Sequence, residues 1–136
     1  MPVSAPLLFT ANDCLDIGTC LGSPVSMDYR ERAPFPFEGR RRMQVALARV
    51  VETGLPLIYL NQVGGQDELV FDGASFVLSA RRELCAQMPA FRVAAQTVTM
   101  ERDGDGWVPV KTPLVPLPDG DEADWLAATL GLRDYV

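Results

Sequence analysis

The 136-residue chain has the composition of a small folded protein, with 48% hydrophobic and 22% charged residues. Its net charge of -6 argues against a general role in nucleic-acid binding, because phosphate contacts depend on clustered Lys and Arg. Histidine is absent, which excludes Ser-His-Asp and Cys-His catalysis and most zinc sites.

Sequence features also bear on the compartment. The chain begins without a charged segment followed by an apolar one, and no apolar run approaches the roughly 20 residues that a membrane-spanning helix needs. We therefore expect a cytoplasmic protein without membrane contact. Cys14, Cys20 and Cys85 are expected to be free thiols, because no two of them have zinc-finger spacing.

The first forty residues show little regular pattern. Two apolar stretches, Val3–Phe9 and Cys14–Leu21, are broken by Pro, Gly, Asn and Asp, so we expect one strand and otherwise irregular structure in residues 1–32. Residues 33–39 are predicted to form a loop, because Pro34 and Pro36 restrict both themselves and the residues before them.

Residues 40–53 have the spacing of an amphipathic helix. Gly54 favours the left-handed conformation that ends a helix, and Pro56 prevents the helix from resuming. Leu57–Leu60 then lacks polar alternation, which is typical of a strand covered on both faces. A helix leading into a buried strand indicates a layered α/β domain. The residues expected to face the core are Met43, Ala46, Leu47, Val50 and Val51.

The middle of the chain alternates turn signals with short apolar runs. Asn61–Glu68 is predicted to be a polar loop after the strand, a position where α/β proteins commonly build sites. Leu69–Phe71 and Ala74–Leu78 read as two short strands around the turn Asp72-Gly73. Glu83–Met88 can pair with the second of them as a hairpin.

The last third predicts a hairpin and a helix. Two Asp-Gly pairs in residues 102–106 indicate a turn between Val93–Glu101 and Trp107–Lys111. We interpret that run as a turn and not as a calcium loop, because the other EF-hand ligand positions are lacking. Three prolines make Thr112–Asp119 an extended linker. A helix should then open at Asp121-Glu122 and carry Trp125, Leu126, Thr129 and Leu130.

The string from Glu52 to Leu78, ETGLPLIYLNQVGGQDELVFDGASFVL, resembles the glutamine-hydrolysing domain of glutamine-dependent NAD synthetases. The tail Glu122–Val136 is similar to the segment that joins glutaminase to synthetase in that family. The resemblance implies an α/β fold, a partial nitrilase-like αββα sandwich. It also implies that residues 1–111 form part of the glutaminase domain and residues 112–136 a linker and first helix toward a synthetase domain.

The family chemistry uses a cysteine thiolate that attacks the side-chain amide of glutamine, a glutamate base and a lysine that stabilises the charged intermediate. The released ammonia reaches a second domain, which uses ATP and magnesium to make NAD. The family nucleophile lies in a Cys-Glu-Asp-Ile-Trp motif, whose counterpart here is Cys14-Leu15-Asp16-Ile17-Gly18. The resemblance thus makes Cys14 the candidate nucleophile, and a free thiol without a role is the alternative.

A second candidate site residue is Arg40. Where the family has a Ser-Pro pair followed by a Gly and a basic residue near the bound glutamine, this chain has Ala33-Pro34 and then Gly39-Arg40. Ala33 lacks the hydroxyl, but the Arg40 guanidinium can meet a substrate carboxylate as a fork of donors. The alternative is a solvated start of the predicted helix.

Parts of the family chemistry have no counterpart in the chain. The general-base glutamate and the lysine precede the nucleophile in the family, whereas Lys111, the only lysine, follows it, and the ATP-binding loop is missing. We expect part of a glutamine-hydrolysing NAD synthetase that is inactive as an isolated chain and holds no cofactor itself. The alternatives are a non-catalytic subunit completed by a partner chain and a small nitrilase-superfamily amidase. Unpaired sheet edges lead us to expect self-association.

Overall fold

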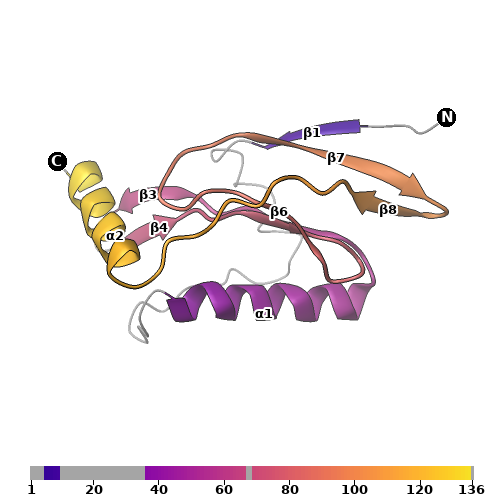
Figure 1. Ribbon diagram of the computed structural model, residues 1–136, viewed down its shortest axis with the longest axis horizontal. Helices are drawn as coiled ribbons and strands as arrows, with labels where there is room; N and C mark the ends of the chain where they lie inside the picture. Colours follow the sequence, from indigo (N-terminus) through magenta and orange to yellow (C-terminus); the bar gives the residue numbers. More distant parts are fainter. Residues whose placement is uncertain (1–4, 10–35, 67–68, 136) are drawn as a thin grey trace.

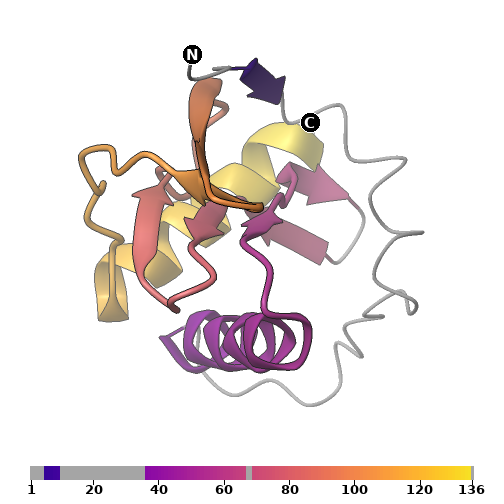
Figure 2. The same cartoon turned by 90° about the vertical axis from the view of Figure 1, so that its right-hand side faces the viewer.

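The computed structural model describes residues 5–9, 36–66 and 69–135, with side chains from residue 41 onward. Helix α1 lies beneath a first sheet, and a second sheet lies above that (Figures 1 and 2). Helix α2 packs on a separate hairpin at one end of the molecule. The elements are β1 (Ala5–Phe9), α1 (Pro36–Thr53), β2 (Leu57–Tyr59), β3 (Val63–Gln66), β4 (Leu69–Asp72), β5 (Phe76–Leu78), β6 (Leu84–Gln87), β7 (Gln96–Asp103), β8 (Gly106–Pro109) and α2 (Gly120–Tyr135).

Helix α1 begins earlier than the sequence pattern predicts. The expected loop over residues 33–39 is wrong for its last four residues, because α1 starts at Pro36. Proline is tolerated in the first turn of a helix, where its missing N-H would have had no partner. The helix ends as predicted, since Gly54 has a φ of 67° and donates its N-H to the Val50 oxygen at 2.8 Å.

The predicted apolar face of α1 is confirmed except at one position. Ala46 and Val50 are buried against the first sheet, and Met43 and Leu47 pack beside them. Val51 is exposed, because the sheet covers only a narrow stripe of the helix and Val51 lies on its flank.

Strand β5 is the centre of the first sheet, which has the order β2-β5-β6 and is antiparallel throughout. Successive side chains of a strand point to opposite faces. Phe76 and Leu78 accordingly pack against α1, whereas Val77 packs against the second sheet. The hairpin predicted between β5 and β6 is confirmed. Strand β2 lies at the edge and is only half-buried, so the expectation of full cover on both faces was too strong.

The second sheet has the order β1-β7-β8. Strand β1 is the strand expected in residues 1–32, and the pairing of β7 with β8 confirms the hairpin around residues 102–106. Val98 and Met100 of β7 pack between the two sheets against Val77, Cys85 and Ala86. The two antiparallel sheets therefore share one apolar core.

The region predicted as a polar loop, residues 61–68, is in part a strand. Val63–Gln66 forms β3 and pairs with β4. Glycines have weak strand propensity, but here they allow a close contact with α2. A Cβ added to Gly65 would lie 3.0 Å from the Gly131 Cα, and the Gly65 N-H donates to the Asp134 carboxylate at 2.8 Å.

Helix α2 confirms the predicted C-terminal helix and buries one face on the β3-β4 hairpin. Ala123, Ala127 and Leu130 form this core together with Phe91. The hydrogen bonds from the Arg133 guanidinium and the Gly65 N-H hold the pKa of Asp134 below its usual range. The segment between β8 and α2 is extended, as expected from its prolines.

The described part of the chain is a small mixed α/β structure with two helices and short antiparallel sheets. Among the helices in it, none combines the length and the apolar character needed to cross a membrane.

Truncation of Leu78 tests the core between α1 and β5. Leu78 is 1% exposed, so Leu78→Ala should lower the free energy of unfolding by about 2 to 5 kcal/mol. Leu55 is 62% exposed, and Leu55→Ala should change it by less than about 0.5 kcal/mol. Urea denaturation of both variants measures the difference. Equal losses in the two would show that Leu78 does not lie in the core.

Candidate functional site

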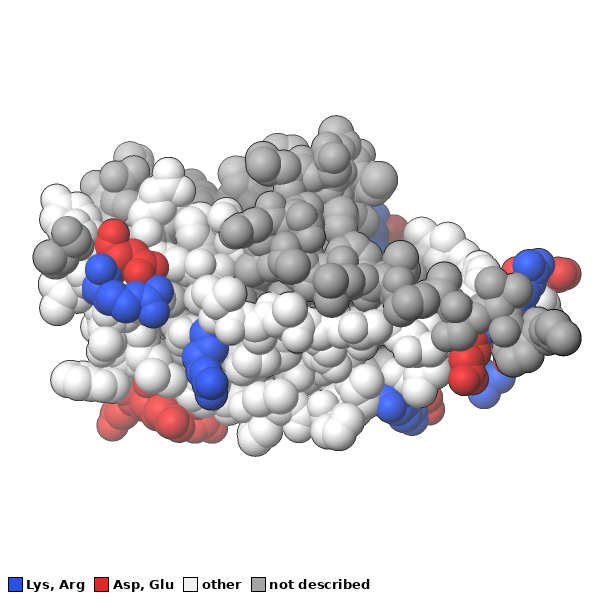
Figure 3. All heavy atoms as spheres, turned by 90° about the horizontal axis from the view of Figure 1, so that it is seen from above, with Lys and Arg blue, Asp and Glu red and all other residues white. Residues whose placement is uncertain are grey.

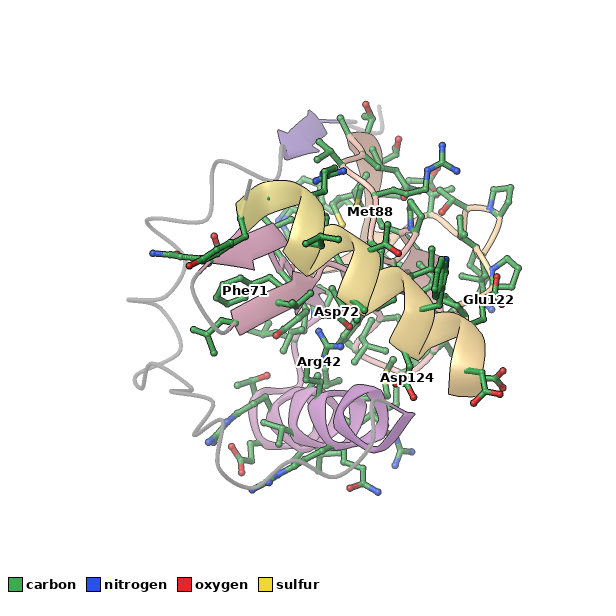
Figure 4. All side chains as sticks on the ribbon, turned by 90° about the vertical axis from the view of Figure 1, so that its left-hand side faces the viewer. Arg42, Phe71, Asp72, Met88, Glu122 and Asp124 are labelled. Atoms are coloured by element: carbon green, nitrogen blue, oxygen red, sulfur yellow. The ribbon has the colours of Figure 1, made fainter. Side chains whose placement is uncertain are left out.

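A buried ion pair links α1 to the end of β4. The Arg42 Nη1 donates to Asp72 Oδ1 at 2.8 Å, and Nη2 donates to Oδ2, so the guanidinium meets the carboxylate as a fork. Their side chains are 15% and 12% exposed. Figure 4 shows Arg42 rising from α1 toward Asp72. The pair joins residues 30 positions apart in the chain.

Asn61 extends the pair into a network. Its Nδ2 donates to Asp72 Oδ1 at 2.9 Å and to the Gly73 carbonyl oxygen at 3.0 Å. Its backbone N-H donates to Ser75 Oγ at 2.9 Å. The end of β2 is therefore tied to the segment between β4 and β5 by side chains.

The segment 73–75 has a backbone that few sequences adopt. Gly73 and Ala74 have φ values of 71° and 50°, in the left-handed region that favours glycine. A Cβ on Gly73 would lie 2.5 Å from Val63 Cγ2. The buried Gln87 amide holds this segment by donating to the carbonyl oxygens of Ala74 and Ser75 at 3.1 and 3.2 Å.

The electrostatics of the network favour a structural ion pair that holds α1 on the sheet over a general acid or base. Burial alone would lower the pKa of the Arg42 guanidinium, but the hydrogen bonds and charge of Asp72, together with Tyr59, hold that pKa above its ordinary value. Arg42 is therefore charged at any working pH. Both carboxylate oxygens of Asp72 already accept hydrogen bonds, which leaves the group poorly placed to take a proton from a substrate.

A shallow hollow lies beside the network. Asn61, Ser75 and Met88 line it together with Arg92 and Ala94. Within the described ranges, no cluster of three or more His, Cys, Asp or Glu could hold a metal ion. The exposed side chain of Arg92 also lines the hollow, and the hollow's one hydroxyl, Ser75 Oγ, accepts the hydrogen bond from the Asn61 N-H at 2.9 Å.

The side chains of the two predicted site residues lie outside the described part of the structure. Cys14 lies outside the described residues. Arg40 belongs to the first turns of α1, and its side chain is not among those described. Cys85 is buried between the sheets, with its thiol 3.5 Å from the Glu83 carbonyl oxygen. Lys111 is exposed and pairs with Glu83 at 3.1 Å.

Sequence reasoning missed Arg42, which is not among the residues of the helix that were expected to face the core. A signal was available, because Arg42, Ala46 and Val50 are spaced four residues apart along the face of α1 that packs on the sheet. A charge in such a stripe needs a buried partner. What the pattern could not indicate was that Asp72 supplies it.

The surface charges of the described residues gather toward the two ends of the molecule in the view from above (Figure 3). Uncharged residues occupy the described surface between them. The Arg42-Asp72 pair is not one of these surface charges, because both of its side chains are largely buried.

Removing one member of the ion pair should be costly. Arg42→Met leaves a buried carboxylate without its cation, and the free energy of unfolding should fall by about 3 to 5 kcal/mol. Arg41→Met is the matched control on the exposed side and should change it by less than about 0.5 kcal/mol. Chemical denaturation measures both.

The double variant Arg42→Met/Asp72→Leu should lose clearly less than the sum of the two single variants, because neither charge remains unpaired. Additive losses would contradict a direct coupling between the two side chains.

Comparisons with known proteins give a consistent answer, although no protein-family model matches the chain. The chain is 50% identical over 95 residues to the glutamine-dependent NAD(+) synthetase of Rhodobacter capsulatus, covering 70% of this chain and 17% of that protein. It is 36% identical over 115 residues to the enzyme of the same name from Xanthomonas campestris, covering 74% of this chain and 19% of the relative.

A solved structure agrees with the sequence matches. The glutamine-dependent NAD+ synthetase from Acinetobacter baumannii, determined in complex with adenosine diphosphate, matches with a TM-score of 0.63 and 28% identity. The match covers 77% of this chain and 19% of that one. The chain thus spans less than a fifth of the length of these relatives. It is homologous to a part of glutamine-dependent NAD(+) synthetase.

Proposed function

We propose that the chain forms part of the nitrilase-like glutaminase domain of a glutamine-dependent NAD(+) synthetase. The observation that carries this proposal is the 50% identity to the Rhodobacter capsulatus enzyme over 95 residues. The layering supports it, because α1 and two stacked sheets correspond to three layers of an αββα sandwich. Residues 1–111 then belong to the glutaminase domain, and residues 112–136 lead toward the ATP-using domain.

In this proposal Cys14 is the nucleophile. Its thiolate attacks the side-chain amide carbon of glutamine, and the tetrahedral intermediate expels ammonia after protonation of the nitrogen. A thioester remains, and water cleaves it to give glutamate and the free thiol. The ammonia is consumed by the ATP-using part of the enzyme, where ATP and magnesium belong.

Arg40 is proposed to bind the carboxylate of the glutamine substrate. The Arg42-Asp72 pair supports this role, because it fixes α1 to the sheet only two residues after Arg40. Arg42 would thus position the start of the helix without touching the substrate. A forked guanidinium suits a planar carboxylate better than a lysine ammonium would.

The isolated chain should not hydrolyse glutamine. An unassisted thiol has a pKa of about 8.5 and is mostly protonated at neutral pH. A general base contributes roughly 10²- to 10⁴-fold in rate, and oxyanion stabilisation contributes a comparable factor. Among the described residues, neither a free general base nor a free lysine lies near Arg42. Asp72 already accepts hydrogen bonds from Arg42 and Asn61, and Lys111 pairs with Glu83 on the surface.

Ammonia release from glutamine by the purified chain and by Cys14→Ala tests this expectation. Both should match the background without protein. Turnover in the wild-type chain that disappears in Cys14→Ala would refute the inactivity of the isolated chain and identify it as an amidase in its own right.

A chimera tests the proposed function directly. In the Rhodobacter capsulatus enzyme, the part that corresponds to this chain would be replaced by all 136 residues, so that the chimera carries both Cys14 and α2. We expect the chimera to make NAD from glutamine within about tenfold of the parent, because the segment supplies equivalent contacts. A folded chimera that uses supplied ammonia but not glutamine would contradict a working role of this chain in glutamine hydrolysis. It would favour a non-catalytic subunit that needs a partner chain.

A further inference from the structure

Helix α2 has a second apolar face, opposite the one that packs on the β3-β4 hairpin. Trp125, Leu132 and Tyr135 are 72%, 68% and 79% exposed. Trp125 and Leu132 are seven residues apart and so lie one above the other on the helix. We call these three residues, with the exposed Ala128 between them, the α2 stripe.

The α2 stripe cannot be buried by rotating the helix. The opposite face contains Ala123, Ala127 and Leu130, which are already in the core. The helix is also held in register by the close approach of Gly131 to Gly65 and by the Gly65 N-H bond to Asp134. Any cover for the stripe must therefore come from outside the described structure.

We propose that the α2 stripe docks against the part of a glutamine-dependent NAD(+) synthetase that this chain does not contain. This inference rests on the proposed function. The length of that missing part supports it, because the chain covers only 19% of the similar Acinetobacter baumannii chain. Helix α2 then lies between two bodies, with its Ala123 face on the hairpin and its Trp125 face on the remainder of the enzyme.

Charge indicates the chemistry of the docking surface. Asp121, Glu122 and Asp124 are exposed on the first turns of α2, and Figure 4 labels two of them. The carboxylates of these three side chains have no hydrogen-bonded or ion-paired partner among the residues that the structure describes. A second copy carries the same net charge of -6, so self-pairing along α2 would be opposed by repulsion. The fitting partner is an apolar recess bordered by Lys or Arg.

The chimera described above provides the test. Trp125→Glu and Leu132→Asp should each lower its melting temperature and reduce NAD synthesis, from ammonia as well as from glutamine, at least tenfold. Val93→Asp is the matched control, because Val93 is 74% exposed and lies outside α2. In the isolated chain all three variants should melt like the wild type. Stripe variants that behave like Val93→Asp in the chimera would overturn the proposal.

A contact measurement covers the case in which the stripe variants fail to fold. A photo-crosslinking phenylalanine analogue at position 125 of the chimera should crosslink within the same polypeptide to residues outside the grafted segment. Crosslinks only between two polypeptides, or none, would overturn the proposal. If the chimera makes NAD from ammonia but not from glutamine and crosslinks as expected, the proposed function fails while the docking surface stands.

Discussion

The ion pair between Arg42 and Asp72 is the constraint on which the arrangement of the layers depends. It is the point at which α1, the end of β2 and the turn between β4 and β5 meet through side chains, with Asn61 bonding both the carboxylate and the turn. A buried charge without a partner costs several kcal/mol, so the helix cannot move away from the sheet without losing that compensation. The pair also fixes where the first turns of α1 begin.

Apolar packing supplies most of the stability, and the ion pair fixes how the packed layers are oriented. Strand β5 contributes core side chains to both faces of the first sheet, because Phe76 and Leu78 face the helix while Val77 faces the second sheet. The third core, between α2 and the β3-β4 hairpin, combines Phe91 and Leu130 with two alanines of α2, and beside it Gly65 and Gly131 permit close backbone contact. The C-terminal helix is thus part of the same body, and its outward apolar residues are available to another one.

Much of this fold follows from local patterns, and the failures have physical causes. Helical spacing predicted α1 and α2, and the Asp-Gly turn predicted the β7-β8 hairpin, because these signals act over a few residues. Strand β3 was missed because its glycines are stabilised by α2, whose Asp134 lies 69 residues after Gly65 in the chain. The role of Arg42 was missed for the same reason, since its partner is set by tertiary structure. Cys14 and Arg40 came from family resemblance, and their roles stay predictions.

If this chain carries the nucleophile of a glutaminase, a reactive glutamine analogue should label that residue. A glutamine analogue with an electrophilic diazoketone in place of the amide would be incubated with the chimera, and the modified residue identified by mass spectrometry. We expect modification of Cys14, with Cys20 and Cys85 unmodified and with protection by excess glutamine. Labelling at another residue, or labelling of Cys14 that glutamine does not prevent, would contradict it.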